Sequence, residues 1–162
     1  MSGNSSARAP ESVWDYPRPP IVRRTERHVT VNLGGVPLID CHGFLEVLET
    51  SHPPTVYLPR AAFPAGSLVP VSGSSWCEFK GKAAYAHVTA GGVVAQRAAW
   101  WYDDPSPGFE TLRDHVALYP GRMDRCRVDG EEVHAQAGDF YGGWITAHLI
   151  GPFKGAPGTL GW

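Results

Sequence analysis

The sequence feature that most limits the possible folds is the content of glycine and proline. The 162-residue chain has 19 glycines and 15 prolines, about a fifth of all residues. Proline breaks helical hydrogen bonding and glycine weakens helices, so these numbers argue against a helical bundle. Short strands joined by tight turns tolerate both residues. Since hydrophobic residues make up 43% of the chain, one domain can build its own core. We therefore expect a single domain of the all-β class.

Apolar and polar residues alternate in several runs, which is typical of half-buried strands. Gly34-Gly35, Gly91-Gly92 and Asp129-Gly130 each separate two such runs, as hairpin turns do. Residues 60–73 are expected to form a loop, and the run 44–49 fits either a strand or a helix. One short helix is predicted over residues 107–115, after capping residues and Pro105. The predicted strands cover residues 28–33, 36–39, 55–58, 75–80, 83–89, 93–102, 125–128 and 131–135.

The two ends of the chain differ in composition. Residues 1–10 are mostly small and polar, so we expect a disordered leader before a single domain over residues 11–162. From Gly138 onward, glycines alternate with aromatic residues. Flexible linkers lack such aromatic anchors, so this tail should pack on the body of the domain, and it could also support a homodimer. Its Phe153-Lys154-Gly155 repeats the tripeptide Phe79-Lys80-Gly81.

Charge and cysteine content narrow the possible partners. The formal net charge is −2 and no long basic run occurs, so nucleic acid is not an expected partner. No apolar run is long enough to span a membrane, so no membrane partner is expected. Three cysteines occur without a CxxC pair, which predicts no metal site and favours reduced thiols in a cytoplasmic protein. No motif indicates an organic cofactor.

Several longer phrases resemble the bacterial domain of unknown function 427 (DUF427) family. They lie at residues 11–20, 48–59, 75–81, 100–105, 116–120, 140–146 and 151–155. The resemblance implies an Mss4-like, or β-tent, arrangement of two small antiparallel sheets. Relatives with this fold often hold zinc through CxxC pairs, which this chain lacks. The family also carries a nucleotidyltransferase-like label, yet neither its Asp-x-Asp pattern nor a phosphate-binding glycine loop occurs here.

The segment Trp76-Cys77-Glu78-Phe79-Lys80-Gly81 concentrates reactive side chains. Cys77 is either a nucleophile or a small buried hydrophobic residue, and an ammonium beside it would favour the thiolate. A regular strand would put Cys77 and Lys80 on opposite faces, so a bulge or bend is needed to bring them together. Trp76, Glu78 and Lys80 would share the other face, which is either exposed to solvent or the floor of a ligand cleft.

A second candidate cluster surrounds a rigid Pro-Pro turn. His52 titrates near neutral pH, and Glu49 could orient it for proton transfer. The alternative is a structural turn in which His52 binds the backbone. Tyr57 follows this turn, and Trp100 and Tyr102 lie in a strand of mostly core residues; these three are candidate ligand-binding residues together with Trp76 and Glu78.

These candidates support two hypotheses of different classes. The first is a small enzyme without an organic cofactor, acting on a small polar or heteroaromatic metabolite in a lyase, cyclase or hydrolase step. Its catalytic residues would be Glu49, His52, Cys77 and Lys80. The second is a non-catalytic module in which the same residues only bind a small molecule or a peptide.

Overall fold

The computed structural model describes residues 8–138 and 141–162, and in them the fold is built almost entirely from β-strands. Residues 1–7 of the expected leader lie outside the described residues. Nine strands form one antiparallel sheet in the order β10-β9-β2-β3-β4-β8-β7-β6-β5. They are β2 (Ile21–Leu33), β3 (Val36–Leu48), β4 (Thr55–Pro59), β5 (Leu68–Cys77), β6 (Gly81–Ala90), β7 (Val93–Trp101), β8 (His115–Leu118), β9 (Arg125–Val128) and β10 (Glu131–Glu132).

Two small sheets complete the fold. β1 (Glu11–Ser12) pairs in parallel with β13 (Leu149–Ile150), and β11 (His134–Ala135) pairs antiparallel with β12 (Trp144–Ile145). The remaining regular elements are single 3-10 turns: η2 (Val13–Asp15), η3 (Arg60–Ala62), η4 (Glu110–Leu112) and η5 (Pro120–Arg122). Among the described residues, no helix is long and apolar enough to cross a membrane. The predicted all-β class is confirmed.

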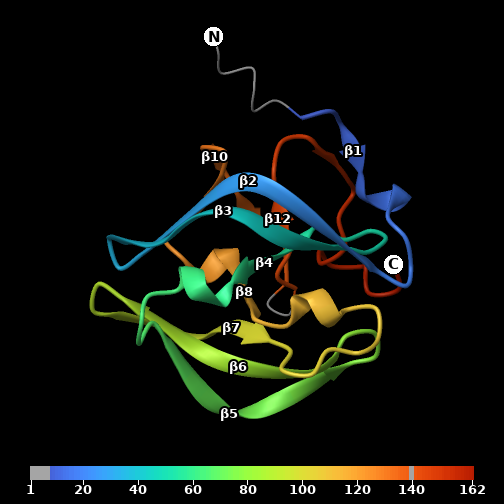
Figure 1. The fold of residues 1–162 in the computed structure, drawn as a ribbon. Helices are drawn as coiled ribbons and strands as arrows, with labels where there is room; N and C mark the ends of the chain where they lie inside the picture. Colours follow the sequence, from blue (N-terminus) through green and yellow to red (C-terminus); the bar gives the residue numbers. More distant parts are fainter. Residues whose placement is uncertain (1–7, 139–140) are drawn as a thin grey trace.

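The two halves of the large sheet face each other. Figure 1 shows β2 and β3 in one layer, β5, β6 and β7 in another, and β4 and β8 between them. The two sheets expected from the family resemblance are thus parts of one continuous sheet. The halves share a core, in which Val31 of β2, Leu58 of β4 and Val88 of β6 are fully or nearly fully buried. The sheet bends so that its two halves face each other, because their contact removes apolar side chains of both halves from water.

The hairpin turns of the two halves also meet. A side chain on Gly34, in the β2–β3 turn, would place its Cβ 2.2 Å from the carbonyl oxygen of Ala90, beside the β6–β7 turn. A Cβ added to Gly91 would come as close to the backbone of Gly34. Both glycines also have positive φ, so the turns need glycine for backbone conformation and for contact.

The predicted helix over residues 107–115 is wrong. Only η4 forms, as a single 3-10 turn. Gly108 has a φ of 93° and Asp114 a φ of 63°, and an α-helix accommodates neither. The spacing of apolar residues instead buries Phe109 and Leu112 beneath the sheet.

Several strand boundaries also differ from the prediction. β2 begins at Ile21 and not at His28, and the strand expected over residues 131–135 divides into β10 and β11, which belong to different sheets. The loop expected over residues 60–73 ends at Ser67, because β5 begins at Leu68 and pairs with β6. The ambiguous run 44–49 is largely strand, since β3 continues to Leu48. At the C-terminal end, the side chain of Trp14 donates to the carbonyl of Pro152 over 2.8 Å, and its ring lies 5.3 Å from that of Trp162.

Candidate functional site

All nine predicted site residues line one cavity of about 370 Å³, which lies on the face of the sheet opposite the main core. They come from three stretches of the chain, residues 49–57, 76–80 and 100–102, so the tertiary structure brings them together. The predicted residues in this lining are Glu49, His52, Tyr57, Trp76, Cys77, Glu78, Lys80, Trp100 and Tyr102.

Strand alternation places the aromatic walls of this cavity. On β4, Val56 and Leu58 enter the main core, so Tyr57 between them points to the cavity face. At the end of β7, Trp101 enters the main core, and Trp100 and Tyr102 point the other way. Trp100 and Tyr102 lie about 6 Å from the Tyr57 ring, with centroid distances of 6.3 and 6.4 Å. Three aromatic rings therefore form a fixed wall.

A hairpin turn brings the thiol and the ammonium together. The expected strand over residues 75–80 is wrong at its end: β5 stops at Cys77, Glu78–Lys80 form the turn, and β6 begins at Gly81. Cys77 pairs with Gly81, so the chain reverses and returns Lys80 to the side of Cys77. The Nζ of Lys80 donates to the Sγ of Cys77 over 3.2 Å. This turn is the bend that was needed to bring Cys77 and Lys80 to the same side of the strand.

The ammonium of Lys80 is largely enclosed. Burial disfavours its charge, but Tyr57, Cys77 and Glu49 together outweigh that effect and raise the pKa of Lys80 above its ordinary value. Lys80 is therefore a cation at neutral pH. Its Nζ also lies 5.9 Å from the centre of the Tyr102 ring, within reach of a cation–π interaction.

His52 is held by an amide of fixed orientation. The Oε1 of Gln136 accepts from the backbone N–H of Gly143 over 3.0 Å, and its Nε2 donates to the carbonyl of Lys154 over 2.6 Å. The same Nε2 lies 3.4 Å from the Nδ1 of His52, which must therefore act as the acceptor. This assigns the ring proton to Nε2, which lies 4.0 Å from the Oε2 of Glu49.

The network also explains the charge state of His52. Burial lowers the pKa of His52, Glu49 opposes this, and Lys154, Arg18 and Lys80 add to the lowering. A protonated ring would direct a second N–H at the amide donor of Gln136, which is unfavourable. His52 is therefore neutral at pH 7, with a ring N–H directed toward Glu49.

Glu49 is the carboxylate that this network positions. Arg18 approaches its Oε2 over 3.4 Å from one side, and His52 lies on another. Its side chain is 22% exposed, so it can reach both the cavity and water. Glu78, also in the lining, is exposed at the cavity rim.

Sequence reasoning missed several cavity residues, among them Tyr85 and Tyr119, and also Gln136, Tyr141, Gly142 and Lys154 near the C-terminal end. A Cβ on Gly142 would lie 2.3 Å from the Trp100 ring, so the tail packs directly on the aromatic wall. One signal was present in the sequence. The repeated Phe-Lys-Gly tripeptides at residues 79–81 and 153–155 contribute the two cavity lysines, Lys80 and Lys154.

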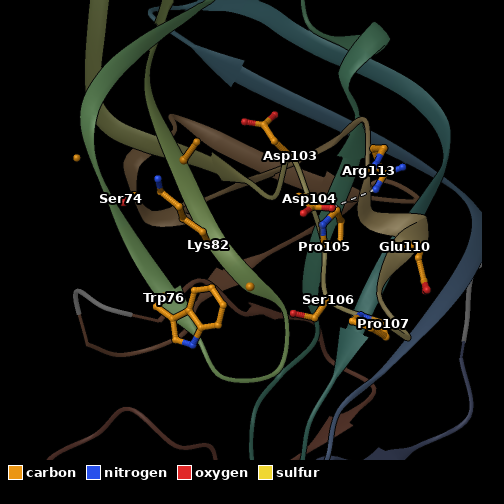
Figure 2. Close-up of a pocket in the computed structure, with 13 residues that line it drawn as sticks. Ser74, Trp76, Lys82, Asp103, Asp104, Pro105, Ser106, Pro107, Glu110 and Arg113 are labelled. Atoms are coloured by element: carbon orange, nitrogen blue, oxygen red, sulfur yellow. Dashed lines mark ion pairs between the residues drawn. The ribbon is translucent and has the colours of Figure 1, made fainter.

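A larger cleft of about 960 Å³ adjoins the site on the other side of Trp76. Figure 2 shows the indole of Trp76 across from Ser106 and Pro107, with Lys82 nearby. Trp76 is 74% exposed, so it stands at the boundary of the two spaces with little packing around it. In residues 8–138 and 141–162, no three His, Cys, Asp or Glu side chains gather closely enough to hold a metal ion.

Comparison with known proteins places this architecture in a family. The model of the family described as Domain of unknown function (DUF427) matches residues 21–129. The matched region contains all nine predicted cavity residues and ends before the tail that completes the cavity. A search of curated proteins finds no match to the chain. Because the family model covers about two thirds of the sequence, the chain belongs to the DUF427 family.

Proposed function

We propose that this protein is a small cytoplasmic enzyme that carries out acid–base or thiol-assisted chemistry on a small polar or heteroaromatic metabolite, without an organic cofactor. The observation that carries the proposal is the convergence of a thiol, an ammonium, a carboxylate and an imidazole on one aromatic-walled cavity. Such convergence of titratable groups in a concave site is characteristic of active sites. The three cysteines are unpaired, in keeping with a cytoplasmic location.

Glu49 is the general base in this proposal. Its carboxylate is held by Arg18 and faces the ring N–H of His52, so its orientation is fixed before a ligand arrives. His52 acts as a positioning residue, because Gln136 occupies the lone pair of its Nδ1. It stabilises the carboxylate by directing its Nε2–H toward it.

Cys77 and Lys80 form the second functional pair. The ammonium donates to the sulfur over 3.2 Å, so a positive charge lies beside the nucleophile of the proposed reaction. Lys80 also stabilises negative charge that develops on a substrate inside the enclosed site. A lyase, cyclase or hydrolase step needs these two elements, a base and a group that stabilises an anion.

The proposal is tested by screening metabolite mixtures for thermal stabilisation and following each stabilising compound by mass spectrometry. We expect a new product with the wild-type protein. Glu49→Gln should lower the turnover rate at least about 100-fold, in the usual range for a general base, while binding persists. Glu132→Gln is the matched control, because this carboxylate pairs with Arg125 on β9, away from the cavity. Turnover that is unchanged in both Glu49→Gln and Cys77→Ser would overturn the proposal.

One observation favours the non-catalytic alternative. Both ring nitrogens of His52 face protein partners, Gln136 and Glu49, which suits a rigid recognition site as well as a catalytic one. In that case stabilising compounds would be recovered chemically unchanged. The nucleotidyltransferase-like alternative is examined in the same assay by adding a nucleoside triphosphate with Mg²⁺ and measuring pyrophosphate release.

A further inference from the structure

Lys80 is a largely enclosed cation of this cavity. Several arginines form an ion pair with a carboxylate, as Arg18 does with Glu49 and Arg23 does with Glu46. Within the described residues, no carboxylate lies within ion-pairing distance of the Lys80 Nζ. Among residues 8–138 and 141–162, its hydrogen-bond acceptor is the sulfur of Cys77. An ammonium has three N–H donors, so two remain for a ligand.

An enclosed ammonium without a carboxylate partner is stabilised when an anion binds to it. Removing a charge from water is costly unless an opposite charge and hydrogen bonds replace the water. Glu49 does not fill this role, since Arg18 and His52 already hold its carboxylate. The second cavity lysine, Lys154, donates instead to the backbone oxygen of Trp162 over 3.3 Å. Of the two cavity lysines, Lys80 is therefore the one without an oxygen acceptor among the described residues.

The surroundings of Lys80 select a flat and unsaturated ligand. Tyr57, Trp100 and Tyr102 form one wall, and Phe79 precedes the lysine in the turn. Aromatic rings pack on one another face to edge or offset, which gives extra stabilisation to a planar guest. A cavity of about 370 Å³ is near the lower end of the usual size range for small-molecule sites, so one or two rings fit.

A second donor lies beside the ammonium. Tyr57 lines the same cavity as Lys80, and its hydroxyl can donate a hydrogen bond. An ammonium and a phenol together present two donors, which match the two oxygens of a carboxylate.

We propose that this cavity binds a planar aromatic or heteroaromatic carboxylate, with the carboxylate on Lys80 and Tyr57 and the ring against Trp100 and Tyr102. The inference names the substrate class for the proposed function and uses the same site. It concerns recognition alone, so binding can be measured whether or not turnover occurs.

The experiment compares matched probes by calorimetry or ligand-observed NMR on the full chain. Benzoate and nicotinate carry the ring and the charge, benzamide and nicotinamide carry the ring without the charge, and cyclohexanecarboxylate carries the charge without the aromatic ring. We expect benzoate or nicotinate to bind at least about tenfold more tightly than its amide, the usual effect of a charge-assisted hydrogen bond. Cyclohexanecarboxylate should bind more weakly than benzoate.

Variants assign the effect to Lys80. Lys80→Met should lower the affinity for the carboxylates about tenfold or more and leave amide binding unchanged, while Lys80→Arg keeps the charge and part of the affinity. Lys82→Met is the matched control, because Lys82 lies on β6 two residues later and lines the neighbouring cleft instead. Equal affinity for acid and amide, no carboxylate binding at millimolar concentration, or an undiminished affinity in Lys80→Met overturns the inference. Carboxylate binding without turnover of any compound would leave it standing and contradict the proposed enzyme.

Discussion

Gly142 is the position where the C-terminal tail contacts the cavity wall most tightly. A Cβ there would lie 2.3 Å from the Cη2 of Trp100, whereas an ordinary contact begins at 3.4 Å, so the indole would have to retreat by about 1.1 Å. The indole of Trp100 has little room to move, because Trp100 is 8% exposed and its ring centroid lies 4.5 Å from that of Tyr119. Overpacking of this kind costs about 1–3 kcal/mol in the free energy of unfolding.

Urea unfolding monitored by circular dichroism measures this cost. With a denaturant slope of about 2 kcal/mol per molar, Gly142→Ala should lower the urea midpoint by about 1 M. Gly161→Ala is the control, since a Cβ at Gly161 meets nothing within 4 Å, and we expect a change below about 0.5 kcal/mol.

A double-mutant cycle identifies the contact responsible. Trp100→Phe removes the three indole atoms that the new methyl would strike, so Gly142→Ala should cost at least about 1 kcal/mol less in that background. If Gly142→Ala has wild-type stability, or if the two changes are additive, the tail does not pack on Trp100 as described.

Three further outcomes are expected. Gly34→Ala should lower the free energy of unfolding by about 2 kcal/mol more than Gly35→Ala, because both have positive φ but only Gly34 meets the opposite turn. His52 should titrate below the ordinary histidine value of 6.5 by NMR; the unfolded chain then binds its proton first, so stability falls as the pH drops below about 6.5. Lys80→Met should slow alkylation of Cys77 by iodoacetamide at neutral pH, because the ammonium that donates to the sulfur is gone.

Each of these has an outcome that contradicts it. Equal stability of the two glycine variants would mean that the hairpin turns do not touch. A His52 ring that titrates above 6.5 would contradict the assignment of Nδ1 as the acceptor of the Gln136 amide. Alkylation at the wild-type rate in Lys80→Met, with Lys82→Met as the control, would show that the two side chains are independent.

The sequence alone determined the strand content and the family. Glycine-centred turns at residues 34–35, 91–92 and 129–130 and period-two alternation define hairpins locally, and local patterns do not depend on distant parts of the chain. The structure puts Trp101 on the opposite face from Trp100 and Tyr102, because neighbouring residues on a strand point to opposite faces. The helix expected from the spacing of a few apolar residues does not form, because Gly108 and Asp114 adopt positive φ, which an α-helix does not accommodate.

Only the tertiary structure decided how the site is assembled. Whether Cys77 meets Lys80 depended on where β5 ends, and pairing with β6 sets that end at Cys77. Gln136 carried no local signal of function, and Lys154 carried only the repeated Phe-Lys-Gly tripeptide. Both reach the cavity because the tail folds back over Trp100. The physical reason is that a polar or charged side chain acquires its role from the groups that replace its water, and those groups come from segments far apart in the sequence.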